Sequence, residues 1–313
     1  MDNQKYKEIL DNVSKVIVGK EDVITYCLVA MVAGGHILLE DVPGTGKTVL
    51  AKSIARSMDM EFSRIQFTPD LLPGDITGLN VWHAQNSEFE FIKGPVFTNI
   101  LLADEINRAT PRTQAGLLEC MQENQVTVDS VTRPLPDPFF VIATQNPVET
   151  SGTFPLPEAQ LDRFLMKLSM GFPDKEEEEN ILRRFMHNDV LKDLDSVAGG
   201  RDILNLRTQA VMVKVSDSII SYITDIAAQS RVRNDVASGI SPRGALALMN
   251  TARVLALFRG RDYVVPEDVK ELAVPVLAHR LIMPHRFGDE NHAQRAIEEI
   301  LQTVSVPTEE FQG

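Results

Sequence analysis

Cysteine is scarce in this chain: its 313 residues include only Cys27 and Cys120, too few for a disulfide framework. Both lie in apolar patterns with helical spacing, and neither has the spacing of a metal site, so small buried side chains are expected. Long apolar runs are also missing, because the longest, residues 27–33, is far too short to span a bilayer. The first residues lack the apolar core of a signal peptide. We therefore expect a soluble cytoplasmic protein without direct membrane insertion.

Cations are in deficit as well. The chain has 31 Lys and Arg against 44 Asp and Glu, and its formal net charge is −13 at pH 7. Because nucleic acid is itself a polyanion, this balance argues against a broad duplex-DNA footprint, although a local basic channel could survive it. Nucleic acid is therefore not expected as the main partner. The length suits two domains, or one large one, with a sizeable core.

The strongest positive signal is the stretch Glu-Asp-Val-Pro-Gly-Thr-Gly-Lys-Thr at residues 40–48. Residues 37–39 before it are an apolar run that predicts a buried strand, and residues 49–56 after it predict a helix. A strand, a glycine-rich turn, Gly-Lys-Thr and a helix in this order are the layout of a phosphate-binding loop. The alternative is an ordinary strand-to-helix turn, which would also favour glycines.

The residue types within this loop suit an anion. Gly44 and Gly46 let the backbone approach an anion closely, and the unpaired first N–H groups of the following helix would point at it. Lys47 would reach the outer phosphates, and Thr48 would supply a hydroxyl to Mg²⁺. One departure is Asp41, which stands where the generic loop has glycine.

Two further apolar strands are followed by polar residues. Residues 99–105 end in Asp104 and Glu105, and residues 139–144 are followed closely by Asn146. The alternation of apolar strands and helices predicts a mostly parallel α/β sheet, in which ligands lie at the carboxyl ends of the strands. The phosphate loop, the two acids and the asparagine should therefore meet at one edge of the sheet.

These polar residues have chemical roles that suit a bound nucleotide. Asp104 fits the orientation of Mg²⁺ and its waters. Glu105 fits activation of an attacking water as a general base. Asn146 could orient that water near the terminal phosphate, or it could be a turn-forming residue before a proline.

The character of the chain changes at about residue 171. Before it, residues 79–83 with 89–92, and residues 125–135, predict two β-hairpins. After it no segment alternates convincingly, so we expect a nucleotide-binding α/β core at 1–170 and a helical domain at 171–313. The assignment of residues 187–215 stays open. Helices are expected at residues 6–18, 21–33, 49–56, 112–124, 157–164, from 173 onward, and at 216–230, 242–258, 266–279 and 293–304.

Two arginines have alternative explanations. A Ser-Pro pair begins the helix that carries Arg243, and a cation in a first turn opposes the helix dipole. Arg243 therefore either binds an anion or is exposed at negligible cost. Arg163 could form a structural ion pair with Asp162 or Glu158, or it could reach the phosphate of a neighbouring subunit.

The combined motifs resemble the MoxR family of AAA+ ATPases, and the resemblance covers nearly the whole chain. An aspartate at position 41 is usual for this resemblance. It implies an α/β P-loop AAA+ module with a parallel sheet flanked by helices, followed by an all-α lid domain. The resemblance rests on the segments LLEDVPGTGKT (38–48), RIQFTPDLLPGD (64–75), KGPVF (93–97), LADEINRA (102–109), ATQNP (143–147), LPEAQLDRF (156–164) and SPR (241–243).

The resemblance also implies roles for single residues. The pair Lys47 and Thr48 matches Walker A, and the two acids match Walker B, with Thr48 and Asp104 on the metal side. Asn146 matches sensor 1, Arg163 the arginine finger and Arg243 sensor 2. The nucleotide contacts that it implies are Val18, Gly19, Pro43, Gly44, Thr45, Gly46, Lys47, Thr48 and Val49.

Members of the family are expected to use ATP and Mg²⁺ in hexameric rings. They are regarded as chaperone-like remodelling or activating ATPases, often acting with proteins that carry von Willebrand factor A domains. The resemblance identifies residues 69–97 as an insert in the second helix and residues 125–135 as a pre-sensor-1 hairpin. An arginine finger supplied in trans requires head-to-tail contacts, which close into rings. Whether Arg243 serves its own nucleotide or a neighbour's is left open.

Three alternatives of other classes are weaker. A nucleic-acid motor would want basic loops, but the inserts carry few cations, Lys93 and Arg133, beside the single Trp82. A metal-insertion motor resembling the magnesium chelatase ATPase subunit would be helped by an acidic or metal-binding segment, which is missing. A nucleotide switch with little turnover disagrees with the complete set of acids, asparagine and arginines. The sequence does not name a client.

Overall fold

The structure is a computed structural model that describes residues 3–84, 87–147, 152–186, 190–284 and 290–307. At its centre lies a five-stranded, wholly parallel sheet with the order β2-β5-β8-β1-β9. The carboxyl ends of all five strands therefore lie at one edge, as the sequence predicted. The strands are β1 (Ile37–Glu40), β2 (Phe62–Gln66), β5 (Ile100–Asp104), β8 (Phe140–Gln145) and β9 (Met166–Leu168).

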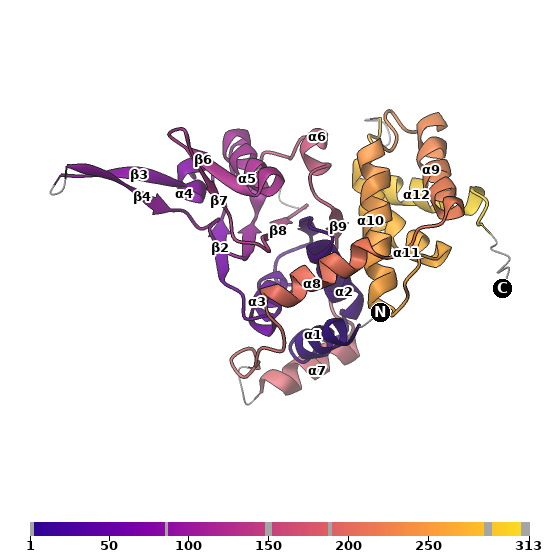
Figure 1. Cartoon of the computed structure of the whole chain (residues 1–313), viewed down its shortest axis with the longest axis horizontal. Helices are drawn as coiled ribbons and strands as arrows, with labels where there is room; N and C mark the ends of the chain where they lie inside the picture. The colour runs from indigo at the N-terminus through magenta and orange to yellow at the C-terminus, as the bar shows by residue number, and fades with distance from the viewer. Residues whose placement is uncertain (1–2, 85–86, 148–151, 187–189, 285–289, 308–313) are drawn as a thin grey trace.

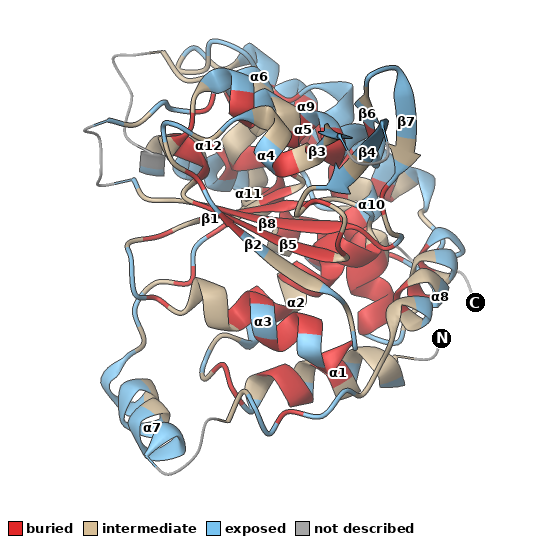
Figure 2. Ribbon diagram, turned by 90° about the vertical axis from the view of Figure 1, so that its left-hand side faces the viewer, coloured by how far each residue is buried: buried red, intermediate tan, exposed pale blue. Residues whose placement is uncertain are grey.

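Both faces of the sheet are covered by helices, which explains why its strands are apolar runs. Figure 2 shows the buried strands between two helical layers. Ile37 and Leu39 face a core shared with α1, α2 and α3, whereas Leu38 faces a second core shared with α5. The alternation of strand side chains thus divides one apolar run between two cores. These helices are α1 (Gln4–Ser14), α2 (Glu21–Val32), α3 (Lys47–Ser57) and α5 (Pro111–Glu123).

The C-terminal part is helical, as expected. Figure 1 shows helices α9 to α12 gathered on the side of the molecule opposite the β3–β4 hairpin. The segment 187–215, left open from the sequence, contains α8, which packs against both α2 and α10. A boundary at residue 171 stays a prediction. The remaining elements are α6 (Glu158–Leu161), α7 (Lys175–Phe185), α8 (Gly200–Val211), α9 (Asp217–Val232), α10 (Pro242–Phe258), α11 (Pro266–Leu277), the 3-10 turns η1 (Ile106–Arg108) and η2 (Ala278–Arg280), and α12 (Glu290–Thr303).

Both expected hairpins are present in the inserts. β3 (Gly78–His83) pairs with β4 (Glu88–Lys93) and forms an arm that extends away from the sheet (Figure 1). A short helix, α4 (Pro73–Thr77), precedes the arm and was not predicted. β6 (Gln125–Val128) and β7 (Val131–Pro134) form the second hairpin, and β6 lies against β3.

The root of the β3–β4 arm is tightly enclosed. A Cβ atom on Gly78 would lie 2.3 Å from the carbonyl oxygen of Ile92, and one on Gly94 would lie 2.2 Å from that of Ile76. Only glycine fits at either position. Gly78 also has φ of 93°, which disfavours any side chain.

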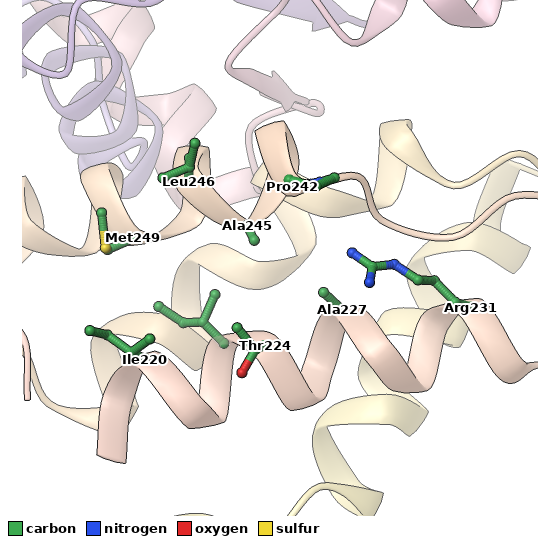
Figure 3. A pocket seen from close by; sticks show the side chains of 9 residues that line it. Ile220, Thr224, Ala227, Arg231, Pro242, Ala245, Leu246 and Met249 are labelled. Carbon is green, nitrogen blue, oxygen red and sulfur yellow. The ribbon is translucent and has the colours of Figure 1, made fainter. Parts of the chain in front are cut away.

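A groove of about 370 Å³ lies between α9 and α10 on the helical part. Its lining is mostly apolar, with Thr224 among the apolar side chains and Arg231 at one end (Figure 3). Arg231 donates from Nε to the carbonyl of Ile240 at 2.9 Å. No helix in the described part of the chain is both long and apolar enough to span a membrane. The groove is lined by Ile220, Ile223, Thr224, Ala227, Arg231, Pro242, Ala245, Leu246 and Met249.

Candidate nucleotide-binding site

The loop between β1 and α3 has the backbone that its glycines permit. Gly44 has φ of 89° and Gly46 φ of 91°, both in the left-handed region. A Cβ on Gly44 would meet nothing within 4 Å, so the space beside the loop is open. Helix α3 begins at Lys47 without a side-chain cap, and its first N–H groups remain available to an anion.

The ammonium group of Lys47 folds back onto its own loop. Its Nζ donates to the carbonyl of Asp41 at 2.7 Å and to that of Val42 at 3.2 Å. Burial lowers the pKa of Lys47, while the carboxylates of Asp41 and of the two acids after β5 act in the opposite direction. The loop after β1 and the acids at the end of β5 lie at the same edge of the parallel sheet, as the strand-end argument predicted.

Asp41, the departure from the generic loop, is a buried connector. Its Oδ1 accepts from Ser169 Oγ at 2.7 Å and from the Gly171 N–H at 3.0 Å, and its Oδ2 accepts from the Met170 N–H at 2.7 Å. These three residues follow β9 and lead toward α7. The carboxylate thus fastens the phosphate loop to the chain that leaves the sheet, which glycine could not do.

Asp104 is oriented by two neighbouring strands. Its Oδ1 accepts from Thr144 Oγ1 at 2.6 Å, and its Oδ2 accepts from Arg64 at 3.1 Å from Nε and 2.7 Å from Nη2. Thr144 lies on β8 and Arg64 on β2, on either side of β5. The same Thr144 Oγ1 accepts from the backbone N–H of Glu105 at 2.9 Å. One buried hydroxyl therefore holds both acids of the pair.

Glu105 has a left-handed backbone, with φ of 57° and ψ of 50°. Its Oε2 accepts from Gln66 Nε2 at 2.8 Å and pairs with Arg108 Nε at 2.8 Å. Such a backbone is uncommon for a residue other than glycine. The carboxylate is thus held at the sheet edge by β2 on one side and by the turn after β5 on the other.

The oxygen atoms at this edge suit Mg²⁺. Thr48 lies in the first turn of α3, and its hydroxyl has no partner within the residues that the structure describes. Those residues also contain no cluster of three or more His, Cys, Asp or Glu that could hold a metal ion alone. Mg²⁺ is commonly held by one or two protein oxygens together with phosphates and waters. The Thr48 hydroxyl and the Asp104 carboxylate fit that pattern.

The segment expected to contact adenine lies after α1. Val18 is half-buried and Gly19 is exposed with φ of 69°. The Glu177 side chain lies over Gly19, since a Cβ on that glycine would be 1.8 Å from Glu177 Oε1. Lys20 Nζ is 3.4 Å from Glu177 Oε2. Glu177 also forms a capping box with Asp174 at the start of α7, so its carboxylate takes part in both the helix start and the cover over Gly19. This contact was not predicted from the sequence.

The three sensor and finger residues fall into two groups. Asn146 directly follows β8 and so lies at the edge that holds the loop and the acids. Arg163 and Arg243 lie elsewhere: Arg163 Nη1 donates to the carbonyl of Leu118 at 3.2 Å, and Arg243 Nη1 is 3.8 Å from Asp162 Oδ2. Among the described residues no hydrogen bond or ion pair joins either arginine to the phosphate loop. An ion pair of Arg163 with Asp162 or Glu158 is not found there either, because Asp162 pairs with other arginines.

A parallel sheet with a glycine-rich Gly-Lys-Thr loop after β1, an acid pair at the end of β5 and an appended helical bundle defines a P-loop fold of the AAA type. Two family descriptions match the chain accordingly. The family described as "ATPase family associated with various cellular activities (AAA)" matches residues 36–166, and the one described as "AAA lid domain" matches residues 228–300.

Three relatives cover nearly the whole chain. An uncharacterized protein of Bacillus subtilis, YeaC, is 46% identical over 96% of this chain and 94% of its own length. Chaperone MoxR1 of Mycobacterium tuberculosis is 42% identical over 94% of this chain and 80% of its own. A crystal structure of a Cytophaga hutchinsonii protein assigned as an ATPase has a TM-score of 0.89 at 42% identity, and covers 98% of this chain and 96% of that one. The chain belongs to the MoxR family of AAA+ ATPases.

Proposed function

We propose that the protein is an Mg²⁺-dependent ATPase that works as a ring, expected to be a hexamer, and remodels or activates other proteins. The observation that carries the proposal is the Thr144 hydroxyl, which bonds both Asp104 and Glu105 and fixes them beside the phosphate loop. Family membership supports ATP as the nucleotide. A relative named as a chaperone supports protein partners, and a partner with a von Willebrand factor A domain belongs to the same proposal.

Each side chain at the sheet edge has a proposed task. Lys47 leaves the carbonyls of its own loop and donates to the outer phosphates. Thr48 and Asp104 would hold Mg²⁺, which would supply positive charge to the phosphate groups. Glu105 takes the proton of the attacking water, and Asn146 orients that water. The loop residues from Pro43 to Val49 surround the phosphates, while Val18 and Gly19 lie against the base.

The proposed ring follows from the placement of the arginines. An arginine finger stabilises charge that develops on the terminal phosphate group. Because Arg163 bonds to the Leu118 carbonyl rather than to the phosphate loop, a second copy of the chain is the proposed recipient of its charge. A head-to-tail contact of this kind closes into a ring when the rotation between subunits allows it.

Two variants test the ATPase proposal. Lys47→Ala should lose binding of a fluorescent ATP analogue, because the main phosphate cation is gone. Glu105→Gln should bind the analogue normally but hydrolyse ATP at least about 100-fold more slowly, as expected for loss of a general base. Glu298→Gln on α12 is the matched control, since that side chain is exposed and distant in sequence from the site.

The outcomes separate the roles. Normal turnover in Glu105→Gln would contradict the role of that residue, and normal binding in Lys47→Ala would contradict the loop assignment. The Glu105→Gln variant also serves to find a partner. When this variant is loaded with ATP, it should retain a bound client protein during purification. The wild type should release the same protein after it hydrolyses ATP.

A further inference from the structure

Arg280 is a buried cation in the 3-10 turn after α11. Its side chain is 4% exposed, and its Nε donates to Asp162 Oδ1 at 2.7 Å. Its two terminal nitrogens donate to the carbonyls of Phe164 at 2.9 Å and Leu165 at 3.1 Å, and also to that of Val276. The guanidinium is therefore fixed in position and orientation by bonds to both the helical part and the α/β part.

Asp162 stands between this buried cation and the two arginines of the proposed mechanism. Its Oδ1 bonds Arg280, its Oδ2 lies 3.8 Å from Arg243 Nη1, and the next residue in the chain is Arg163. The Asp162 carboxylate thus contacts Arg280 and Arg243, and its residue directly precedes Arg163 in the chain. The side chain of Asp162 is 28% exposed, so the carboxylate lies where the buried cation meets the surface.

Arg280 reaches Arg243 by a second route. A Cβ on Gly244, the residue after Arg243, would lie 3.1 Å from Cδ of Arg280. The aliphatic part of Arg280 therefore packs directly against the first turn of α10. His279, the residue before Arg280, contacts the same part of the chain, because its Nε2 lies 3.0 Å from the carbonyl oxygen of Phe164.

We propose that Arg280 and Asp162 are positioning residues that hold Arg163 and Arg243 together as one pair directed at the nucleotide of a neighbouring subunit. In this arrangement Arg243 acts in trans, beside the arginine finger. The inference rests on the proposed ring ATPase. It follows because Arg243 pairs with Asp162, Arg163 directly follows Asp162, and among the described residues no hydrogen bond or ion pair joins either arginine to its own loop.

The substitutions that test this are chosen to keep the chain folded. Removing the Asp162 side chain would leave a buried charge uncompensated, which is strongly destabilising. Asp162→Asn also removes the negative charge but keeps a side-chain oxygen that can accept a hydrogen bond from Arg280 Nε, and Arg280→Lys keeps the positive charge but cannot reproduce a planar fork of donors. The matched control is Arg233→Lys, because Arg233 makes a similar pair with Asp235 at 2.7 Å on the helical part, and neither Arg163 nor Arg243 takes part in that pair.

In steady-state assays, Arg280→Lys and Asp162→Asn should lower kcat by roughly 10- to 100-fold, as expected when catalytic groups are misplaced. KM and the affinity for a fluorescent ATP analogue should stay near those of the wild type, because the nucleotide pocket of each subunit is intact. Arg233→Lys should leave kcat unchanged. A purely structural role of the pair would instead lower melting temperature and binding together.

Mixed rings give the decisive readout. Arg280→Lys subunits have an intact pocket but misplaced arginines, whereas Glu105→Gln subunits have intact arginines but no base. Mixing the two should raise turnover per Arg280→Lys subunit several-fold, because Glu105→Gln neighbours supply the arginines. Mixing with the double variant Glu105→Gln, Arg163→Ala should give no rise.

Three results overturn the inference while leaving the ATPase proposal intact: wild-type kcat in both Arg280→Lys and Asp162→Asn, an equal loss in Arg233→Lys, or no recovery in the mixed rings. Absence of ATP hydrolysis by the wild type would instead overturn the proposed function itself. If Arg280→Lys does not fold, Asp162→Asn is mixed in its place and the same recovery is required.

Discussion

At the scale of single residues, the site is held by hydrogen bonds between segments far apart in the chain. Asp41 is bound to residues 169–171, and Asp104 to residues on the strands on both sides. A charged acceptor bonded to three donors is worth more than neutral bonds of the same number. The phosphate loop is therefore stiff at its start, where Asp41 lies, and open around Gly44.

His36 is the residue whose ionisation should govern acid stability. Its Nδ1 accepts from the Val141 N–H at 3.0 Å, and its Nε2 lies 2.8 Å from the Met121 carbonyl, so the neutral ring with a proton on Nε2 satisfies both contacts. Burial lowers the pKa of His36 to about 4. Because the folded pKa lies below the unfolded one, this contribution to stability is complete above pH 6.5 and is lost as the pH falls toward 4.

We expect the free energy of unfolding, measured with urea, to fall between pH 6.5 and 4 by up to about 1.4 kcal/mol per pH unit from this group. His36→Gln should reduce that slope, although it lowers stability at pH 7. Burial also lowers the pKa of His279, so His279 contributes in the same direction and part of the slope should remain. An unchanged slope in His36→Gln would show that other groups dominate.

At the scale of elements, the sequence predicted the sheet because its strands are apolar runs that end in turns or polar residues. The same patterns placed the loop, the acid pair and Asn146 at one edge. Helix α4 was not predicted because five residues are too few to show a helical period. Helix α8 was not predicted because it buries only Ile203, Leu206 and Ala210, which gives a weak apolar pattern. Contacts such as Arg280 with Asp162 span 118 positions and leave no local signal.

The β3–β4 arm allows a prediction about its own side chains. Trp82 and Phe89 pair edge to face at 5.1 Å and are 51% and 69% exposed, whereas Phe91 on the same strand packs against Phe97 and Arg133. Phe89→Ser should change the free energy of unfolding by less than about 0.5 kcal/mol, as surface substitutions generally do. Phe91→Ser is the matched control and should cost more.

The measurement is again urea unfolding, with emission from the single Trp82 recorded alongside. Emission should resemble that of a water-exposed indole in the folded protein and be quenched readily by acrylamide. If Phe89→Ser cost as much as Phe91→Ser, the tip of the arm would be packed in solution rather than exposed.

At the scale of the whole molecule, one hydrophobic core continues from the sheet through α1, α2 and α8 into the helical bundle. The two parts are therefore not joined by a bare linker. The relative position of the two parts depends on packed side chains as well as on the contacts of Arg280. Both therefore help to set the positions of the proposed arginine pair.

A ring that supplies arginines between subunits should work only when assembled. We expect ATP turnover per subunit to rise with protein concentration and then reach a plateau, because a dilute subunit has no neighbour to complete its site. Turnover and sedimentation would be measured over the same concentrations. Constant turnover per subunit at concentrations where only monomers sediment would contradict an active site shared between subunits.

The glycine pair at the root of the arm has a mechanical consequence. Because the backbone is packed closely around Gly78 and Gly94, we expect the arm to move together with the body that carries it. Six residues per strand at about 3.3 Å each make the arm about 20 Å long, so a root rotation of about 10° moves the tip by about 3–4 Å. A small rotation of the α/β part is therefore converted into a larger displacement of the aromatic side chains near the end of the arm.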